Sequence, residues 1–307
     1  MAVKKKTQVV APSQADPRAP LDAAAFLSAA QRVLAVLRDD LLTRANESPG
    51  VTDALKAQWE VEKDARRTGD PWEVWRRRLV VQVAAAWVLS LVFARTLEDH
   101  GLLERNRIAG PGATDSQEQF RGIALYLSDR DYLLTVFGEL SNLPAAKDLF
   151  DPAHNPVWKL GPSIPGARAL LDLFRAPDPE APAFRFGQAD TRFLGDLYQS
   201  LDEETQERFA LLQTPHFVES YILDRTLERA IARFGLDETT LIDPTCGSGH
   251  FLLGAFERLV EHRLRKEPGL DVREAARRAL DAVYGADLNP YAVAIARFRM
   301  TGVCQRV

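Results

Sequence analysis

Apolar residues with helical spacing dominate the first 180 residues, and no strong strand pattern occurs before about residue 240. Asp22 stands where a helix N-cap is expected. The apolar residues after it share one helical face: Ala25, Phe26, Ala29, Val33, Val36 and Leu37. The chain is therefore predicted to begin its folded part as a helix, after a non-periodic stretch at 1–20 that reads as a disordered tail.

Further helices are predicted over 53–67, 71–99, 117–127, 131–140 and 167–174. The helix at 71–99 is the longest and most apolar, and His100-Gly101 supplies its end, because glycine readily takes the left-handed conformation of a C-terminal cap. Its apolar run is shorter than the roughly 20 residues that a membrane-spanning helix needs. A buried core helix is therefore predicted here, and no membrane partner.

The pattern changes after the helical region. Prolines recur between 144 and 182, and 177–182 is the best boundary for a helical N-terminal domain at 21–180. An apolar strand is then predicted at 240–242 and a second at 282–286, with helices from Phe251, from Val272 and from Pro290. Strands that alternate with helices are typical of a parallel α/β sheet.

Composition narrows the function only slightly. A hydrophobic content of 46% and a charged content of 27% are those of an ordinary globular protein, and a net charge of −4 argues against a basic surface over the whole chain. Lys4-Lys5-Lys6 and Arg76-Arg77-Arg78 are local exceptions, for which solvated segments are favoured over phosphate contacts. The two cysteines form no disulfide framework and show no zinc spacing, so a reducing cytoplasm and no metal site are expected.

The candidate chemistry lies between the first predicted strand and the helix from Phe251. Gly247 and Gly249 remove side chains where the backbone must turn and approach a ligand. Asp243, at the carboxyl end of the strand, is placed to receive a cationic group. A strand, a glycine turn and a helix in this order predict a site for a nucleotide-like ligand.

A second acid, Asp287, follows the second predicted strand. In nucleotide-binding sheets an acid at this point accepts hydrogen bonds from ribose hydroxyls. The alternative is a cap for the helix that starts at Pro290, and Asn289-Pro290 fits that reading too.

The stretch Asp243-Pro244-Thr245-Cys246-Gly247-Ser248-Gly249-His250-Phe251 resembles, in order, the cofactor-binding motif I of S-adenosylmethionine-dependent adenine-N6 DNA methyltransferases, Asp-Pro-x-Cys-Gly-Ser-Gly-x-Phe. The resemblance implies an α-helical N-terminal domain followed, over 186–307, by the start of an α/β Rossmann-like class I methyltransferase domain with motifs X, I and II. It also implies S-adenosylmethionine as the cofactor. The implied cofactor-binding residues are Thr214, Asp243, Cys246, Gly247, Ser248, Gly249, Asp287 and Leu288.

Thr214 is implied as a cofactor-binding residue because of the segment that precedes motif I. Thr214-Pro215 is first of all a helix cap, with threonine as N-cap and proline at the first helical position of a helix that runs on to Gly235. In the methyltransferases that the chain resembles, a Thr-Pro that opens a helix forms motif X and folds over the methionine end of the cofactor. That context favours the functional interpretation.

Two resemblances to catalytic residues are rejected. Asn289-Pro290-Tyr291 has one proline and directly follows the ribose acid, where the family's motif II commonly has Asn-Pro-Tyr, so it is not interpreted as the catalytic Asn-Pro-Pro-Tyr. Cys246 suggests the thiol nucleophile of cytosine-C5 enzymes, but it lies inside the cofactor loop. No catalytic residue is assigned, because Asn-Pro-Pro-aromatic does not occur in residues 1–307.

The wider layout, with Arg95-Thr96-Leu97-Glu98-Asp99-His100-Gly101 and Gly195-Asp196-Leu197-Tyr198-Gln199, resembles the large PglX-type methyltransferases of phage defence (type 2 BREX) and fused restriction-modification enzymes. Double-stranded DNA is the implied partner of the full-length enzyme, with defence-system proteins as further candidates. We expect the chain to be an amino-terminal portion with an incomplete sheet, with weak or absent cofactor affinity and no methyl transfer on its own. In that half-built sheet we expect Leu241, Ile242, Val283, Ile295 and Phe298 to lack cover.

Two other functions stay open at this point. One is a methyltransferase that acts on RNA or protein, because enzymes with the Asn-Pro-Pro-Tyr motif include those classes. The other is a non-catalytic interaction module, in which the helical region docks a partner and the cofactor site is vestigial.

Overall fold

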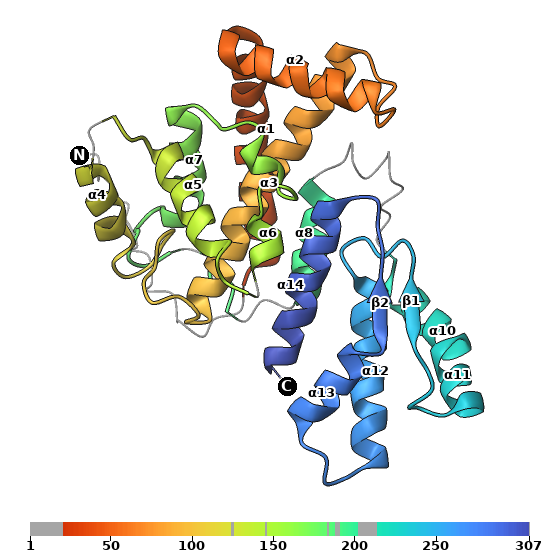
Figure 1. Ribbon diagram of the computed structural model, residues 1–307. Coiled ribbons are helices and arrows are strands. Elements are labelled where there is room, and N and C mark those ends of the chain that lie inside the picture. The colour runs from red at the N-terminus through yellow and green to blue at the C-terminus, as the bar shows by residue number, and fades with distance from the viewer. Residues whose placement is uncertain are drawn as a thin grey trace, which may run out of the picture.

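A computed structural model of the chain describes residues 21–123, 126–144, 146–182, 184–187, 191–201 and 214–306. The predicted tail at 1–20 lies outside these residues. Most of the described chain is helical, with one small parallel sheet (Figure 1). The helices before the sheet are α1 (Ala23–Glu47), α2 (Pro49–Asp64), α3 (Trp72–Asp99), α4 (Ala113–Ile123), α5 (Asp129–Leu140), α6 (Lys147–Phe150), the 3₁₀ turn η1 (Pro156–Trp158), α7 (Ile164–Arg175), α8 (Thr191–Leu201), α10 (His216–Arg225) and α11 (Leu227–Phe234).

The helices predicted over the first 180 residues are present with shifted ends; of the one predicted at 117–127, residues 124 and 125 lie outside the described part of the chain. Asp22 caps α1, because its carboxylate accepts a hydrogen bond from the N–H of Ala25 at 2.9 Å. The buried face of α1 differs from the predicted one: Phe26 and Leu37 are buried, but Leu34 and Leu41 complete the face and Val36 is 59% exposed. Helix α2 begins at Pro49, four residues earlier than predicted, since proline is well suited to a first helical turn.

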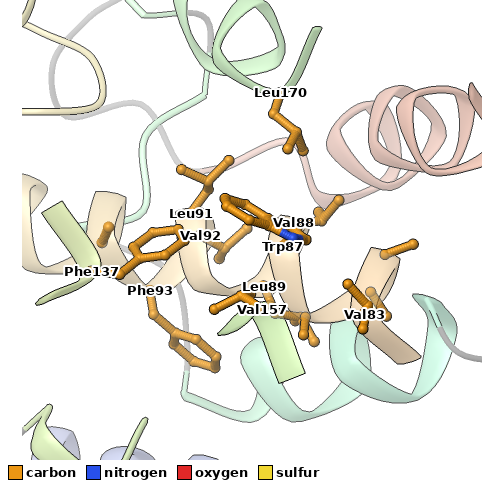
Figure 2. Close-up of a cluster of buried hydrophobic side chains, with 14 of the residues drawn as sticks. Val83, Trp87, Val88, Leu89, Leu91, Val92, Phe93, Phe137, Val157 and Leu170 are labelled. Atoms are coloured by element: carbon orange, nitrogen blue, oxygen red, sulfur yellow. The ribbon is translucent and has the colours of Figure 1, made fainter. Parts of the chain in front are cut away.

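Helices α1 to α8 form what we call the helical half, and α3 is its centre. Its residues from Leu79 to Leu97 are almost all buried, and Figure 2 shows Trp87, Val88 and Leu91 packed among side chains from other helices. The ring N–H of Trp87 donates to the carbonyl of Leu160 at 3.0 Å, so even this large side chain has its polar atom satisfied. Helix α3 is long and apolar enough to cross a membrane, but 94% of its most apolar window is buried inside the protein. The predicted core position is confirmed.

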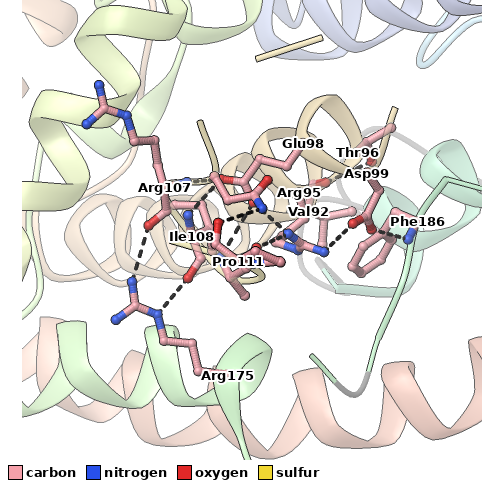
Figure 3. A network of polar contacts seen from close by, with 12 residues as sticks. Val92, Arg95, Thr96, Glu98, Asp99, Arg107, Ile108, Pro111, Arg175 and Phe186 are labelled. Carbon is pink, nitrogen blue, oxygen red and sulfur yellow. Dashed lines mark hydrogen bonds and ion pairs between the residues drawn. The ribbon is translucent and has the colours of Figure 1, made fainter. Parts of the chain in front are cut away.

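A buried polar network fixes the carboxyl end of α3 (Figure 3). Arg95 and Glu98 are fully buried and form an ion pair at 2.6 Å, and Arg95 also pairs with Asp99. Glu98 accepts hydrogen bonds from the backbone N–H groups of Arg107 and Ile108, so the loop after α3 is held against the helix. Buried charges that are paired and hydrogen-bonded in this way hold a unique local structure.

The sheet and its helices form the second half. Strand β1 (Leu241–Asp243) pairs in parallel with β2 (Val283–Gly285), with Leu241 opposite Val283 and Asp243 opposite Gly285. The connection contains α12 (His250–Lys266) and α13 (Val272–Leu280), as the alternating pattern predicts. The α14 helix (Pro290–Arg306) follows β2. The coarse prediction of a helical part followed by a parallel α/β part is therefore confirmed.

Helix α14 belongs to both halves. In Figure 1 it lies between the helical half and the sheet. Ile295 and Phe298 are buried in the same core as α3, and the rings of Phe93 and Phe298 meet edge to face at 5.0 Å. The expectation that these two residues lack cover is wrong, because the helical half covers them. For Ile242, which is 68% exposed, the expectation holds.

Candidate functional site

The loop between β1 and α12 is tied to the end of β2 by backbone hydrogen bonds. The N–H of Ala286 donates to the carbonyl of Asp243 at 2.9 Å, and the N–H of Cys246 donates to the carbonyl of Ala286 at 2.9 Å. The N–H of Gly249 closes the turn on the carbonyl of Cys246 at 2.8 Å. The structure therefore brings the two acids of the predicted site, Asp243 and Asp287, to the same end of the sheet, where parallel α/β sheets bind ligands.

Glycine is required twice in this loop. Gly247 has φ = 51° and Gly249 has φ = 88°, a region that side-chain-bearing residues enter at a cost. A Cβ on Gly249 would also lie 3.0 Å from the Cβ of Ala296 on α14. Gly249 thus allows both the turn into α12 and the close approach of α14.

Asp287 lies two residues after the end of β2 and also holds the glycine loop in place. One of its carboxylate oxygens accepts the N–H of Gly247 at 2.9 Å, and the other accepts the N–H of Asn289 at 2.8 Å. Each oxygen keeps capacity for a further donor such as a hydroxyl. The residue after it, Leu288, is 92% exposed. Its exposure places an apolar side chain in solvent beside the acid.

The alternative role considered for Asp287, capping α14, is carried out by Asn289, two residues later. The side-chain oxygen of Asn289 accepts the N–H of Tyr291 at 3.0 Å and that of Ala292 at 3.4 Å. Asn289 therefore caps α14, and Asp287 holds the glycine loop.

The electrostatics of the loop follow from burial and from the proximity of the two acids. Burial raises the pKa of Asp243, the N–H of Thr245 at 3.0 Å opposes this rise, and the charge of Asp287 adds to it. The pKa of Cys246 is raised to about 11, by burial first and then by Asp243 and Asp287. A negative field therefore fills this end of the sheet and attracts a cationic ligand group.

Cys246 is a poor nucleophile in this setting. Its thiol is buried, and a pKa of about 11 leaves little thiolate at neutral pH. The geometry thus agrees with the rejection of a cytosine-C5-type mechanism for this residue.

The predicted cap at Thr214 is wrong. The residue before α10 is Pro215, which makes no side-chain capping bond, and the helix begins at His216. The predicted helix to Gly235 is also interrupted, because Thr226 separates α10 from α11 with φ = −115° and ψ = −76°. Thr214 itself is half-buried and is the first described residue after the gap at 202–213. Its cofactor role stays a prediction.

The structure shows what the asparagines of two Asn-Pro segments do: Asn289, whose resemblance to the catalytic motif was rejected above, and Asn155 in the helical part. The amide of Asn289 caps α14 with its oxygen and donates its Nδ2 to the hydroxyl of Tyr198 at 2.8 Å. Asn155, in Asn155-Pro156-Val157-Trp158, is 1% exposed and donates to Ser90 in the helical core. Both amides are therefore engaged in hydrogen bonds within the protein.

Two residues that the sequence did not single out support the glycine loop. Arg299, fully buried on α14, donates to the carbonyl of Ser248 at 2.5 Å and to its hydroxyl at 3.2 Å. Tyr198 on α8 holds Asn289, and its ring packs edge to face on Tyr291 at 6.2 Å between centroids. The one signal in the sequence was the segment Gly195-Asp196-Leu197-Tyr198, which the resemblance marked without a role.

The outer side of β1 faces an apolar groove of about 440 Å³. Its lining comes from α10, α11, β1 and the start of α12: Ile222, Leu223, Leu227, Ala230, Leu241, Ile242, Pro244 and Phe251 are among the residues. Within the described part of the chain, β1 pairs only with β2. No group of three or more His, Cys, Asp or Glu side chains able to hold a metal occurs in that same part.

Comparison with known proteins gives two relatives. The chain is 40% identical over 296 residues to an adenine-specific methyltransferase PglX of Streptomyces coelicolor, and the match covers 91% of this chain and 24% of that protein. It is 28% identical over 110 residues to a putative type II restriction enzyme and methyltransferase of Methanocaldococcus jannaschii, a match that covers 34% of this chain and 8% of that protein. No family model and no solved structure matches.

These matches agree with the resemblance carried by the motifs. The first extends well beyond the glycine loop into the helical half, so the helical half shares the ancestry of the loop. The chain spans about a quarter of the length of the first relative. Over nearly its whole length, the chain is therefore similar to one part of an adenine-specific methyltransferase PglX.

Proposed function

We propose that the Asp243–Gly249 loop and Asp287 form the S-adenosylmethionine site of an adenine-N6 DNA methyltransferase. One observation carries the proposal: two glycines at positive φ turn the chain from β1 into α12, and the acid after the parallel strand β2 lies 2.9 Å from the N–H of the first of them. The similarity to an adenine-specific methyltransferase supports the choice of cofactor. The α/β half is accordingly proposed to be part of a Rossmann-like class I fold.

The residues present fit this cofactor chemically. Asp243 carries the charge to hold the cationic amino group. Each oxygen of Asp287 already accepts one backbone N–H and can accept a second donor, such as a ribose hydroxyl. The cofactor would supply an electrophilic methyl group on its sulfonium. The negative charges of Asp243 and Asp287 favour a positively charged ligand beside either carboxylate.

Adenine as the acceptor is proposed from the first relative, an adenine-specific methyltransferase. Residues 1–307 contain no Asn-Pro-Pro-aromatic, and the amides of the two partial matches, Asn289 and Asn155, are hydrogen-bonded within the protein. We propose adenine in double-stranded DNA, with the base flipped out, as the acceptor, and residues 1–307 as a part that holds the cofactor. The greater length of the first relative supports this division. Phage defence is the proposed setting.

Equilibrium dialysis with radiolabelled S-adenosylmethionine tests the cofactor assignment. The native chain is expected to bind weakly at one site, and Asp243→Asn to reduce binding about tenfold or more, because a charged hydrogen-bond partner is lost. Asp281→Asn is the matched control: it removes an exposed carboxylate near the start of β2 that pairs with Arg277. Equal loss in both variants, or no binding by the native chain at millimolar ligand, would contradict the proposal.

A further inference from the structure

Helix α8 connects the core of the helical half to the candidate cofactor site. Its apolar residues Leu194, Leu197 and Leu201 are buried in the same cluster as α1 and α3. The guanidinium of Arg38 on α1 donates to the carbonyl of Leu201 at 3.1 Å and fixes the end of α8. One side of α8 is therefore held firmly by the helical half.

The other side of α8 meets the glycine loop through a backbone with no side chain. A Cβ on Gly195 would lie 2.3 Å from Nη1 of Arg299 and 2.9 Å from the hydroxyl oxygen of Ser248. Both neighbours are almost completely buried, so neither moves aside easily. Gly195 thus provides the space in which Arg299 reaches the carbonyl of Ser248 at 2.5 Å.

One helical turn later, α8 meets the loop after β2. The hydroxyl of Tyr198 accepts a hydrogen bond from Asn289 at 2.8 Å. Asn289 is the cap of α14 and the second residue after Asp287, whose carboxylate it also contacts through its N–H. Residues three apart lie on the same face of a helix. Gly195 and Tyr198 therefore contact the glycine loop and the loop after β2 from the same face of α8.

A third contact lies between these two. His250, the first residue of α12, has its Nε2 3.5 Å from a carboxylate oxygen of Asp196. Gly195, Asp196 and Tyr198 of α8 thus lie against the glycine loop, the start of α12 and the loop after β2, respectively. No part of this arrangement involves the outer face of the sheet.

We propose that α8 is a positioning element of the cofactor site, acting through Arg299 and Tyr198, and that it couples the packing of the helical half to the geometry of the glycine loop. Arg299 and Tyr198 are positioning residues: they touch Ser248 and Asn289, which border the site. The proposal rests on the function proposed above for its biological meaning. Its physical content, that α8 holds the loop, is independent of any ligand.

Cys246 provides a reporter inside the loop. Its thiol is buried, so an uncharged reagent such as N-ethylmaleimide modifies it only when the loop opens. Replacing Cys304, the other cysteine of the sequence, with alanine leaves Cys246 as the single target. The rate of modification under native conditions then measures the opening of the loop in the absence of any cofactor.

In that background, Tyr198→Phe is expected to speed modification of Cys246 about two- to tenfold, as expected for the loss of one hydrogen bond from a local opening equilibrium. Tyr132→Phe is the matched control, because Tyr132 is equally buried and its hydroxyl donates to the carbonyl of Arg107 at 2.7 Å, far along the helical half. The control is expected to lower the Tm without changing the modification rate. Equal rates in the two variants would overturn the proposal.

Two glycine substitutions test the contact between Gly195 and Arg299 in the same way. Gly195→Ala is expected to displace Arg299 and accelerate modification by more than tenfold, whereas Gly138→Ala in α5, whose new Cβ meets nothing closer than 4.0 Å, leaves the rate unchanged. If Gly195→Ala fails to fold, the tyrosine pair still decides the outcome. Dialysis with S-adenosylmethionine is run in parallel: native protein that fails to bind contradicts the proposed function, whereas unchanged Cys246 rates contradict the role of α8.

Discussion

At the scale of single residues, the site depends on a carboxylate in an unfavourable environment and on two glycines at positive φ. Asp243 is kept half-buried near a second carboxylate, and burial raises its pKa. Gly247 and Gly249 are in the left-handed region. Such features persist where the surrounding structure holds them, and they occur often at functional sites. Their energetic consequences can be measured without any ligand.

Asp243→Asn is expected to raise the Tm of the free protein at neutral pH while it weakens cofactor binding. The pKa of Asp243 is raised in the folded state, so its charge opposes folding above that pKa, and this penalty disappears as the pH falls through it. The advantage of the variant should therefore shrink on acidification, as measured by thermal unfolding at a series of pH values.

The opposite sign is expected at Asp237. Its pKa is lowered, chiefly by the hydrogen bond from Lys266, so its charge favours folding at neutral pH and that contribution is lost as the pH falls. Asp237→Asn should lower the Tm slightly at neutral pH. A variant of Asp243 that behaves like Asp237→Asn would contradict the assigned electrostatics.

Gly249→Ala is expected to destabilise the protein more than Gly101→Ala does. Both glycines have positive φ, 88° and 66°, so each substitution carries a backbone cost of about 1 to 2 kcal/mol. Only Gly249 has a crowded neighbour, the Cβ of Ala296 at 3.0 Å, whereas nothing lies within 4 Å of a Cβ at Gly101. Denaturant unfolding of the two variants measures the difference, and equal losses would show that α14 does not press on the loop.

At the scale of elements, polar anchors at helix ends decide where the connecting segments lie. The Arg95–Glu98 pair holds the loop after α3, and Asp99 accepts the N–H of Phe186 ahead of α8. The end of α3 is thus linked to the segment that leads toward the candidate site. Figure 3 shows these side chains gathered around one turn of helix.

Glu98→Gln is expected to cost about 3 kcal/mol of unfolding free energy, because it leaves the buried charge of Arg95 with an incomplete set of partners. Glu139→Gln is the matched control. Its ion pair with Arg107, at 2.8 Å, is half-exposed and its loss should cost less than about 1 kcal/mol. Chemical denaturation of both variants provides the comparison, and similar losses would mean that the network is not the anchor of this loop.

Element types were largely predictable from the sequence, and their junctions were not. The spacing of apolar residues located α3 and the order β1, α12, α13, β2, because period and length decide those elements. The break at Thr226 and the missing cap at Thr214 lie at the two ends of α10, a helix that packs on α12, and the local sequence pattern predicted neither. Asp287 was located correctly at the end of its strand. Its bond to Gly247 and the part played by Arg299 arise only from contacts between distant segments.

At the scale of the whole molecule, α14 joins the two hydrophobic clusters. Ile295 and Phe298 lie in the core of the helical half, and Met300 lies in the cluster around α12 and α13. The sequence predicted uncovered apolar residues here, because the cover comes from α3, some 200 positions earlier in the chain. The molecule is therefore expected to unfold as one cooperative unit.

Phe298→Ala is expected to cost about 3 to 5 kcal/mol and to preserve a single transition. Tryptophan fluorescence reports the helical half, where all five tryptophans lie, and the rate of Cys246 modification reports the other half. The two probes should give one denaturant midpoint in the native protein and one lower midpoint in the variant. Separate midpoints in the native protein would show that α14 does not couple the halves.

The central claim, that the glycine loop binds S-adenosylmethionine, is tested most directly by an NMR titration of the amide-labelled chain to millimolar cofactor, which detects weak binding. The signals of Gly247, Ser248, Gly249 and Asp287 are expected to shift together and to saturate along one binding curve. Those of the helical core, such as Trp87, are expected to stay in place. Signals that remain unchanged at the loop, or that shift only on other surfaces, would contradict it.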